Sequence, residues 1–417
     1  MASCACKEDG DEERLAPSAA RICAKCGGPA VAIPRRHLLC RPCILESVHN
    51  FFYKAVCSAR CNNPRETVVL AFSGGVNSLL MLHLVHQCTA VAKKKMQFRV
   101  CVVNIDEGSV LGGSKTEHEE EGSLLAAMAA PYGFSFERVA LQSLWPEELR
   151  VSADEFLQSL ALSEDLDAKS ESLRLMREQL LQNTAARLGA RWVMLGDNAS
   201  RLATRIISDT VRGRGAGLPR EVAAVCPTPD SGITRLRPLR DVLALEVNIS
   251  SQHAQLEPVV FRNVLTLSHP HGSIARLTED FVASLQMAKT STVHTLLRTA
   301  EKLSCGEGAM GAVGGESGGE HRVCTLCNSP WKPVGIRDQD ADGQLCSGCR
   351  ALSAKLGHVP DTLWPPPKQA VLEKLVAECG ANLPAEDAAA KELALERRAR
   401  REFNEDPLDD GGVGFSW

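Results

Sequence analysis

The chain has 417 residues, of which 44% are hydrophobic and 24% charged, and its formal net charge is −4. This composition is ordinary for a folded globular protein and argues against disorder along the whole length. No apolar run reaches the 18 or more residues that a membrane helix needs, and the polar start, residues 1–10, lacks the pattern of a secretory signal. We therefore expect a cytoplasmic protein.

The predicted elements begin after a flexible tail at residues 1–20 and a cysteine-rich module at 21–63. From 64 to 303, short apolar or β-branched runs alternate with segments of helical spacing. The runs that predict strands are Thr67–Phe72, Phe98–Ile105, Phe134–Leu141 and Arg191–Gly196. The segments that predict helices are 77–92, 117–130, 168–188, 199–211, 275–287 and 291–303. This alternation favours a doubly wound α/β domain, with a parallel sheet covered by helices on both faces.

The remainder of the chain divides into three predicted parts. Residues 304–321 are rich in glycine and are typical of a flexible linker. A second cysteine module follows at 322–352. Residues 353–417 form a C-terminal extension, with a charged segment near 386–403 that predicts a helix.

A candidate phosphate loop follows the first predicted strand. Its residues are Ser73, Gly74, Gly75, Val76, Asn77 and Ser78. Glycines allow the backbone to approach a ligand, and the free N–H groups at the start of the next helix attract an anion. The simpler interpretation is a Gly-Gly turn that only joins strand to helix. The order Ser-Gly-Gly-x-x-Ser resembles the loop of ATP-pyrophosphatases, but Asn77 stands where that family usually carries aspartate, which puts metal-assisted use of ATP in doubt.

Two sets of paired cysteines have the spacing of metal knuckles. They are Cys23, Cys26, Cys40 and Cys43, and Cys324, Cys327, Cys346 and Cys349. Each Cys-x-x-Cys pair places two thiolates on one ion, and two pairs complete a tetrahedral site. We expect two structural zinc sites, with an iron–sulfur cluster as the alternative. Cys57 and Cys61 are interpreted as structural, or as a weak extra site.

Residues 201–240 are locally basic, with eight arginines against three acidic residues. The candidates for contact with RNA phosphates are Arg201, Arg205, Arg212, Arg214, Arg235, Arg237 and Arg240. Such a stripe is typical of a surface that binds phosphate. The alternatives are a solvated face and pairing of the arginines within the fold.

Three motifs connect the chain to a known family: Gly196-Asp197-Asn198-Ala199-Ser200-Arg201, Arg235–Arg240 and Ile274–Phe281. In this order they closely resemble the cytoplasmic tRNA 2-thiolation protein 2 family. The resemblance implies an ATP-pyrophosphatase fold, with Gly196, Asp197 and Asn198 beside the phosphate loop in a degenerate nucleotide site. It also implies a heterodimer with a catalytic thiolation subunit, tRNA binding, and sulfur from a ubiquitin-like carrier, used to thiolate the wobble uridine of the tRNAs for Lys, Glu and Gln.

The chain departs from the catalytic relatives of that family at several positions. Asp197 replaces a histidine, Ser200 and Arg201 replace paired carboxylates, and no cysteine lies between Cys101 and Cys226. Because a thiolate carries the sulfur in those enzymes, we expect no catalytic residue in this chain. Cys226 is interpreted as a small buried residue rather than a substitute. The alternatives are an active sulfurtransferase and a non-enzymatic zinc-module scaffold.

Overall fold

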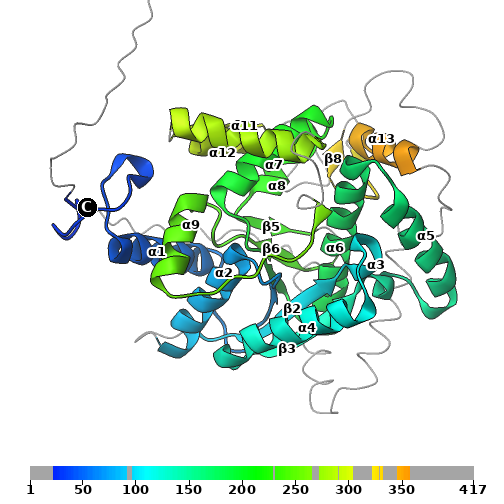
Figure 1. Cartoon of the computed structure of the whole chain (residues 1–417), viewed down its shortest axis with the longest axis horizontal. Coiled ribbons are helices and arrows are strands. Elements are labelled where there is room, and N and C mark those ends of the chain that lie inside the picture. Colours follow the sequence, from blue (N-terminus) through cyan, green and yellow to red (C-terminus); the bar gives the residue numbers. More distant parts are fainter. Residues whose placement is uncertain are drawn as a thin grey trace, which may run out of the picture. The chain divides into compact units, whose positions relative to one another are not determined.

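The computed structural model describes residues 22–91, 96–228, 231–264, 272–289, 291–303, 322–327, 329–331 and 345–356 (Figure 1). All of these residues belong to one compact unit, Met1–Pro366. The expected tail at 1–20, the linker at 304–321 and the charged segment at 386–403 lie outside the described residues. Among the described helices, none is both long and apolar enough to cross a membrane.

A six-stranded sheet forms the centre of this unit, in the order β3-β2-β1-β4-β6-β5. The strands are β1 (Thr67–Ala71), β2 (Arg99–Asp106), β3 (Ser135–Ala140), β4 (Trp192–Met194), β5 (Val225–Pro227) and β6 (Thr234–Leu236). The pairings β3–β2, β2–β1, β1–β4 and β4–β6 are parallel, and β5 pairs antiparallel with β6 at the edge. A second, two-stranded sheet joins β7 (Arg322–Val323) to β8 (Pro330–Trp331).

The described α-helices surround the six-stranded sheet (Figure 1). They are α1 (Arg41–Ser58), α2 (Val76–His86), α3 (Gly108–Leu111), α4 (Lys115–Ala129), α5 (Arg150–Leu162), α6 (Leu166–Arg187), α7 (Ala199–Val211), α8 (Leu218–Val222), α9 (Ala244–His253), α11 (Ile274–Ala288), α12 (Thr292–Lys302) and α13 (Ser347–Leu356). Short 3-10 and π segments lie between some of them, including the π turn Gln87–Val91 after α2.

Both faces of the sheet are buried, as the predicted fold class requires. Val69 of β1 packs in a core cluster that contains residues of α5 and α6. Its neighbours Val68 and Leu70 pack in a second cluster with residues of α1, α2 and α9. Successive side chains of a strand point to opposite faces, so one apolar run serves two cores. The prediction of a doubly wound α/β fold is confirmed.

The structure also contains strands and helices that the spacing of apolar residues did not predict. The four predicted strands are present within two residues of their expected bounds, and α7 occupies the predicted range 199–211. Strands β5 and β6 were not predicted, because each has only three residues and three residues cannot show a period. Helices α5 and α9 were also not predicted from the spacing of apolar residues.

Candidate functional site

The phosphate loop joins β1 to α2, as expected. Its backbone turns at Gly74, which has a φ of +72°. Gly75 precedes the first residue of α2 and offers no side chain to cap the helix. Ser78 Oγ donates to Gly75 O at 3.0 Å and accepts from Ser73 N at 3.3 Å. The hydroxyl group of Ser78 is therefore engaged in holding the loop.

The motif that begins at Gly196, directly after β4, lies against the phosphate loop. A Cβ added at Gly196 would lie 3.3 Å from Ser78 N, so only glycine allows this approach without a shift. Asn198 caps α7 by accepting from Arg201 N at 2.9 Å, and its Nδ2 donates to Asn77 Oδ1 at 3.0 Å. The fold thus brings together two motifs that are more than a hundred residues apart, through a pair of neutral amides.

A further segment, which carried no motif in the sequence, covers the phosphate loop. Val259 N donates to Gly74 O at 3.0 Å. A Cβ added at Gly74 would lie 2.8 Å from the ring of Phe261 and 2.7 Å from Leu125. This close packing of an aromatic ring leaves little room beside Gly74 for a ligand.

Phe261 also lines a cavity of ≈ 270 Å³. The cavity walls include Glu117, Glu120 and Glu121. Three carboxylates repel a triphosphate, although His118 and Arg262 also contribute to the wall. The cavity is therefore a poor match for the phosphates of ATP.

Asp197, the residue in place of the histidine of catalytic relatives, pairs with arginines. Its Oδ2 lies 3.3 Å from Arg237 Nε and 3.8 Å from Arg205 Nη1. Burial alone would raise the pKa of this carboxyl group, but the neighbouring guanidinium groups hold the pKa below its usual value. A carboxylate held in this way is ionised and already has its partners.

The expected basic surface stripe needs a correction, because much of it is inside the protein. Less than one-tenth of each of the following residues is exposed: Arg214, Arg235, Arg237 and Arg240. Arg205 and Arg212 are half-buried, and Arg201 is exposed. The sequence showed the excess of arginine over this stretch, but apart from Glu221 the acidic partners lie outside the stretch and could not be matched to it.

The buried guanidinium groups are neutralised by acidic residues of α6, of α8 and of other parts of the chain. Arg235 Nη1 lies 3.2 Å from Glu178 and 3.7 Å from Glu221, and Arg212 Nη2 lies 2.6 Å from Asp167. The remaining pairs join Arg174 to Glu171, Glu178 and Glu221, Arg205 to Glu221, Arg214 to Glu171, Arg237 to Glu221, and Arg240 to Asp241 and Glu301. We call the ion pairs that join α6, α7, α8, β6 and the loop 212–214 the arginine–carboxylate network. Buried charges of this kind are stable only when paired.

Cys226 lies at the edge of the same network. It is 3% exposed, and its Sγ is 3.5 Å from Arg235 Nη2. This agrees with its interpretation as a buried residue.

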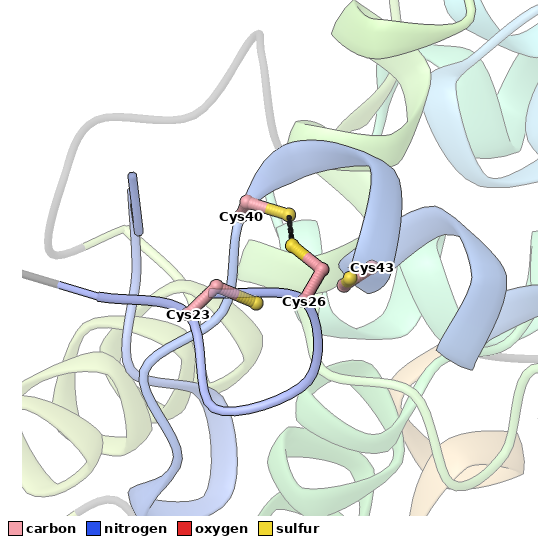
Figure 2. A group of neighbouring side chains, drawn as sticks. All are labelled: Cys23, Cys26, Cys40 and Cys43. Carbon is pink, nitrogen blue, oxygen red and sulfur yellow. Dashed lines mark hydrogen bonds between the residues drawn. The ribbon is translucent and has the colours of Figure 1, made fainter. Parts of the chain in front are cut away.

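Two groups of four cysteines are assembled as the spacing predicted, and Figure 2 shows the first of them. Within each group the sulfur atoms lie within 4.8 Å of one another. Cys26 Sγ is 3.5 Å from Cys40 Sγ, and Cys327 Sγ is 3.8 Å from Cys346 Sγ. A tetrahedron with metal–sulfur bonds of about 2.3 Å has edges of about 3.8 Å, so both groups fit one metal ion.

The first knuckle is closed by its backbone. Cys23 N donates to Gly28 O at 2.7 Å, and Gly27, with a φ of +74°, donates from its N to Cys23 O at 3.0 Å. Cys40 immediately precedes α1, so the second pair of ligands stands at the start of that helix.

Cys57 and Cys61 join neither group among the described residues. Cys61 is fully buried, and burial raises the pKa of its thiol to about 12. A thiol with so high a pKa stays protonated and is a weak nucleophile. For Cys61, these observations favour the structural interpretation.

Comparison with known proteins gives a consistent result. Residues 273–341 match the family model described as cytoplasmic tRNA 2-thiolation protein 2. The protein of that name from Danio rerio is 30% identical over 68% of this chain and 67% of its own length. The chain therefore belongs to the cytoplasmic tRNA 2-thiolation protein 2 family.

Other members of the family show how much of their length the chain spans. The Dictyostelium discoideum protein is 29% identical over 73% of this chain, and the Homo sapiens protein is 28% identical over 75% of it. The matched region makes up 57% of the Dictyostelium protein and 72% of the human one. The chain thus spans little more than half the length of the first relative.

A solved structure supports the fold. The U34-tRNA thiolase NcsA from Methanococcus maripaludis, determined with its [4Fe-4S] cluster, superposes with a TM-score of 0.53 over 69% of this chain and 89% of its own. The two share 16% sequence identity, so the likeness concerns the fold alone. It agrees with the ATP-pyrophosphatase type that the family resemblance implied.

Proposed function

We propose that this chain takes part in the 2-thiolation of the wobble uridine in the cytosolic tRNAs for Lys, Glu and Gln, as the non-catalytic partner of a catalytic thiolation subunit. The observation that carries the proposal is that Asn77 is hydrogen-bonded to Asn198 and Asp197 is paired with Arg237, so that both side chains are engaged within the fold. In this proposal the partner activates the uridine, and a thiocarboxylated ubiquitin-like carrier supplies the sulfur.

The contacts around the phosphate loop support a non-catalytic role. The side-chain amides of Asn77 and Asn198 are hydrogen-bonded to each other. Neither is a carboxylate that would bind Mg²⁺ well. Asp197 is engaged with Arg237 and Arg205. Val259 and Phe261 cover Gly74. ATP could bind here only if this covering segment moved, and we propose that ATP is used by the partner.

The burial of Cys226 also argues against sulfur chemistry at this residue. A persulfide route needs an accessible thiolate near the nucleotide. Within the described part of the chain, Cys226 is buried beside Arg235, which is itself paired with Glu178 and Glu221. The sulfur of Cys226 is therefore closed off from a substrate.

We propose that each four-cysteine group holds one zinc ion with a structural role. Four thiolates saturate a tetrahedral ion and leave no open position for catalysis. The short sulfur–sulfur distances favour a single ion, because a four-iron cluster places iron and sulfide atoms between its thiolates and holds them farther apart.

Contact with tRNA is proposed for the exposed part of the arginine-rich segment. Arg201 stands in the first turn of α7, next to the loop that follows β4, and is exposed to solvent. An exposed cation there can reach an RNA phosphate, whereas the buried arginines cannot. Contacts of this kind position the RNA and do not read its bases.

The proposed function is tested by reconstitution. The full chain is purified alone and together with its catalytic paralogue, and ATP-dependent thiolation of unmodified tRNA is measured with the carrier present. We expect turnover only with both chains. Robust turnover by this chain alone would establish the active sulfurtransferase, and full activity of the paralogue without it would leave only a scaffold role.

The tRNA contact is tested by charge reversal at Arg201. Arg201→Glu should weaken tRNA binding several-fold and reduce its dependence on salt, because one phosphate contact is lost. The control for a general change in charge is Arg276→Glu. Arg276 is a half-exposed arginine that pairs with Glu279. Equal affinities for the original chain and Arg201→Glu would remove the assignment.

A further inference from the structure

One short loop of the α/β domain lies directly against the second four-cysteine group. This loop, Arg212-Gly213-Arg214, follows α7 and faces the Cys346–Cys349 knuckle. Ser347 Oγ donates to Gly213 O at 3.1 Å. A Cβ added at Gly348 would lie 2.5 Å from Arg214 Cγ and 2.9 Å from Arg212 O. Loop and knuckle are therefore in direct contact, closer than any residue except glycine allows.

Arg214 is the residue of the loop that reaches inward. It is 8% exposed and pairs with Glu171 of α6. Its Nε, however, has no hydrogen-bond partner, although it is buried. This nitrogen lies 2.9 Å from the position that a Cβ of Gly348 would take, one residue before Cys349. A buried donor without an acceptor is costly, so a source of negative charge is expected nearby.

A metal-loaded second group is such a source. A divalent ion bound by four thiolates carries a net negative charge. Three of the four cysteines of this group are buried, with Cys324 and Cys349 at 0% exposure, and Cys327 is half-buried. Water cannot neutralise a charge in that position, and cations of the protein must do so.

The other knuckle of the group also faces the arginine–carboxylate network. Cys327 lines a cavity of ≈ 20 Å³ together with Arg235 and Glu178. A space of this size holds about one water molecule. Both halves of the group thus adjoin guanidinium groups of the α/β domain, Arg214 at one knuckle and Arg235 at the other.

We propose that metal in the second four-cysteine group clamps its Cys346–Cys349 knuckle to the loop Arg212-Gly213-Arg214 of the α/β domain, with Arg214 as the positioning residue that offsets the charge of the thiolates. The coupling acts in both directions. Without Arg214 the metal is held less firmly. Without metal the cysteines take up protons, the negative charge that Arg214 faces is lost, and the knuckle and the loop separate. The proposal depends on metal at this group and not on the role in tRNA thiolation.

The first test measures how fast the metal leaves. A full-length chain carrying Cys23→Ser and Cys26→Ser retains only the second group, and a chromogenic chelator reports release of its zinc. Arg214→Met should speed release at least tenfold. Glu171 keeps Arg174 and Arg212 as partners, so the variant leaves no carboxylate alone. Arg214→Lys, which keeps the charge, should restore part of the slow release.

The matched control is Arg240→Met. Arg240 is also 8% exposed and paired with acidic residues, Asp241 and Glu301, but these lie outside the second group. We expect its release rate to equal that of the original chain. If Arg214→Met and Arg240→Met release zinc at the same rate, Arg214 has no special role and the proposal is wrong.

The second test needs no variant and decides the matter even if Arg214→Met does not fold. The original chain is treated briefly with trypsin, with zinc bound and after removal of zinc by a chelator. Loss of metal should expose the loop and raise cleavage after Arg212 and Arg214 at least several-fold, while cleavage after Arg187, at the end of α6, stays constant. Equal cleavage at the loop with and without metal would overturn the clamp.

Discussion

Gly74 is the residue at which the phosphate loop meets the segment that covers it. Its φ of +72° belongs to the left-handed region, which other residues rarely adopt. In addition, Leu125 and Phe261 stand where a Cβ would point. Two separate physical reasons therefore require glycine here. The positive φ is a property of the loop itself, whereas the close contact depends on side chains from other segments.

Gly74→Ala should destabilise the protein more than backbone strain alone predicts. Strain in the left-handed region costs about 1–3 kcal/mol, and forcing a methyl group against packed side chains costs a similar further amount, about 1–3 kcal/mol. The measurement is the free energy of unfolding by chemical denaturation.

The matched control for this change is Gly189→Ala. Gly189 has a φ of +61° but nothing within 4 Å of its would-be Cβ, so this variant reports strain alone. If the two variants lose the same free energy, Phe261 does not press on the phosphate loop, and the account of a covered loop is wrong.

At the scale of elements, α1 and the first four-cysteine group depend on each other. Cys40 takes the capping position before Arg41, but its side chain makes no capping hydrogen bond. Its role is instead to bring a thiolate to Cys26, 3.5 Å away, and so to join the helix start to the first knuckle. A metal at this group would fix where α1 begins.

Cys40→Ser should remove one metal ion without harming the helix start, because serine is a good capping residue. We expect elemental analysis to fall from about two zinc ions per chain to about one. Cys57→Ser, at an exposed cysteine outside both groups, is the control and should leave the content unchanged. A content near zero in the original chain would contradict the metal assignment altogether, and iron in place of zinc would favour the cluster alternative.

At the scale of the molecule, the arginine–carboxylate network joins α6, α7, α8 and β6 through charges that no single element contains. The pKa values of two carboxyl groups near its centre shift in opposite directions. Burial raises the pKa of Asp209, and the neighbouring arginines do not fully offset this. At Glu221 burial acts in the same direction, but Arg235 and Arg174 outweigh it and hold the pKa well below its usual range.

These opposite shifts predict opposite effects of removing the two charges. The raised pKa of Asp209 means that its stabilising contribution is present below the unfolded value of about 3.9 and is lost as the pH rises through the folded value. Asp209→Asn should therefore raise the free energy of unfolding at pH 7, and this gain should shrink as the pH falls toward 4. Chemical denaturation across this pH range measures the change.

Glu221→Gln is the counterpart. The lowered pKa of Glu221 means that its contribution is present above the unfolded value of about 4.3 and is lost only as the pH falls through the folded value. Removing this charge leaves buried guanidinium groups unpaired and should cost about 3–5 kcal/mol at pH 7. If both variants change stability in the same direction at pH 7, the two carboxyl groups do not differ as described.

The sequence by itself determined the α/β class, the loop at residues 73–78, the helix at 199–211 and the two cysteine groups. These features are encoded locally, in the period of apolar residues, in glycines next to a strand, and in Cys-x-x-Cys spacing. Only the tertiary structure decided which of the arginines are buried and which are exposed. Whether a guanidinium group faces RNA or is buried depends on carboxylates far away in the chain, such as Glu178 beside Arg235. For the same reason the covering of Gly74 by Phe261, across nearly two hundred residues, could not be read from either segment alone.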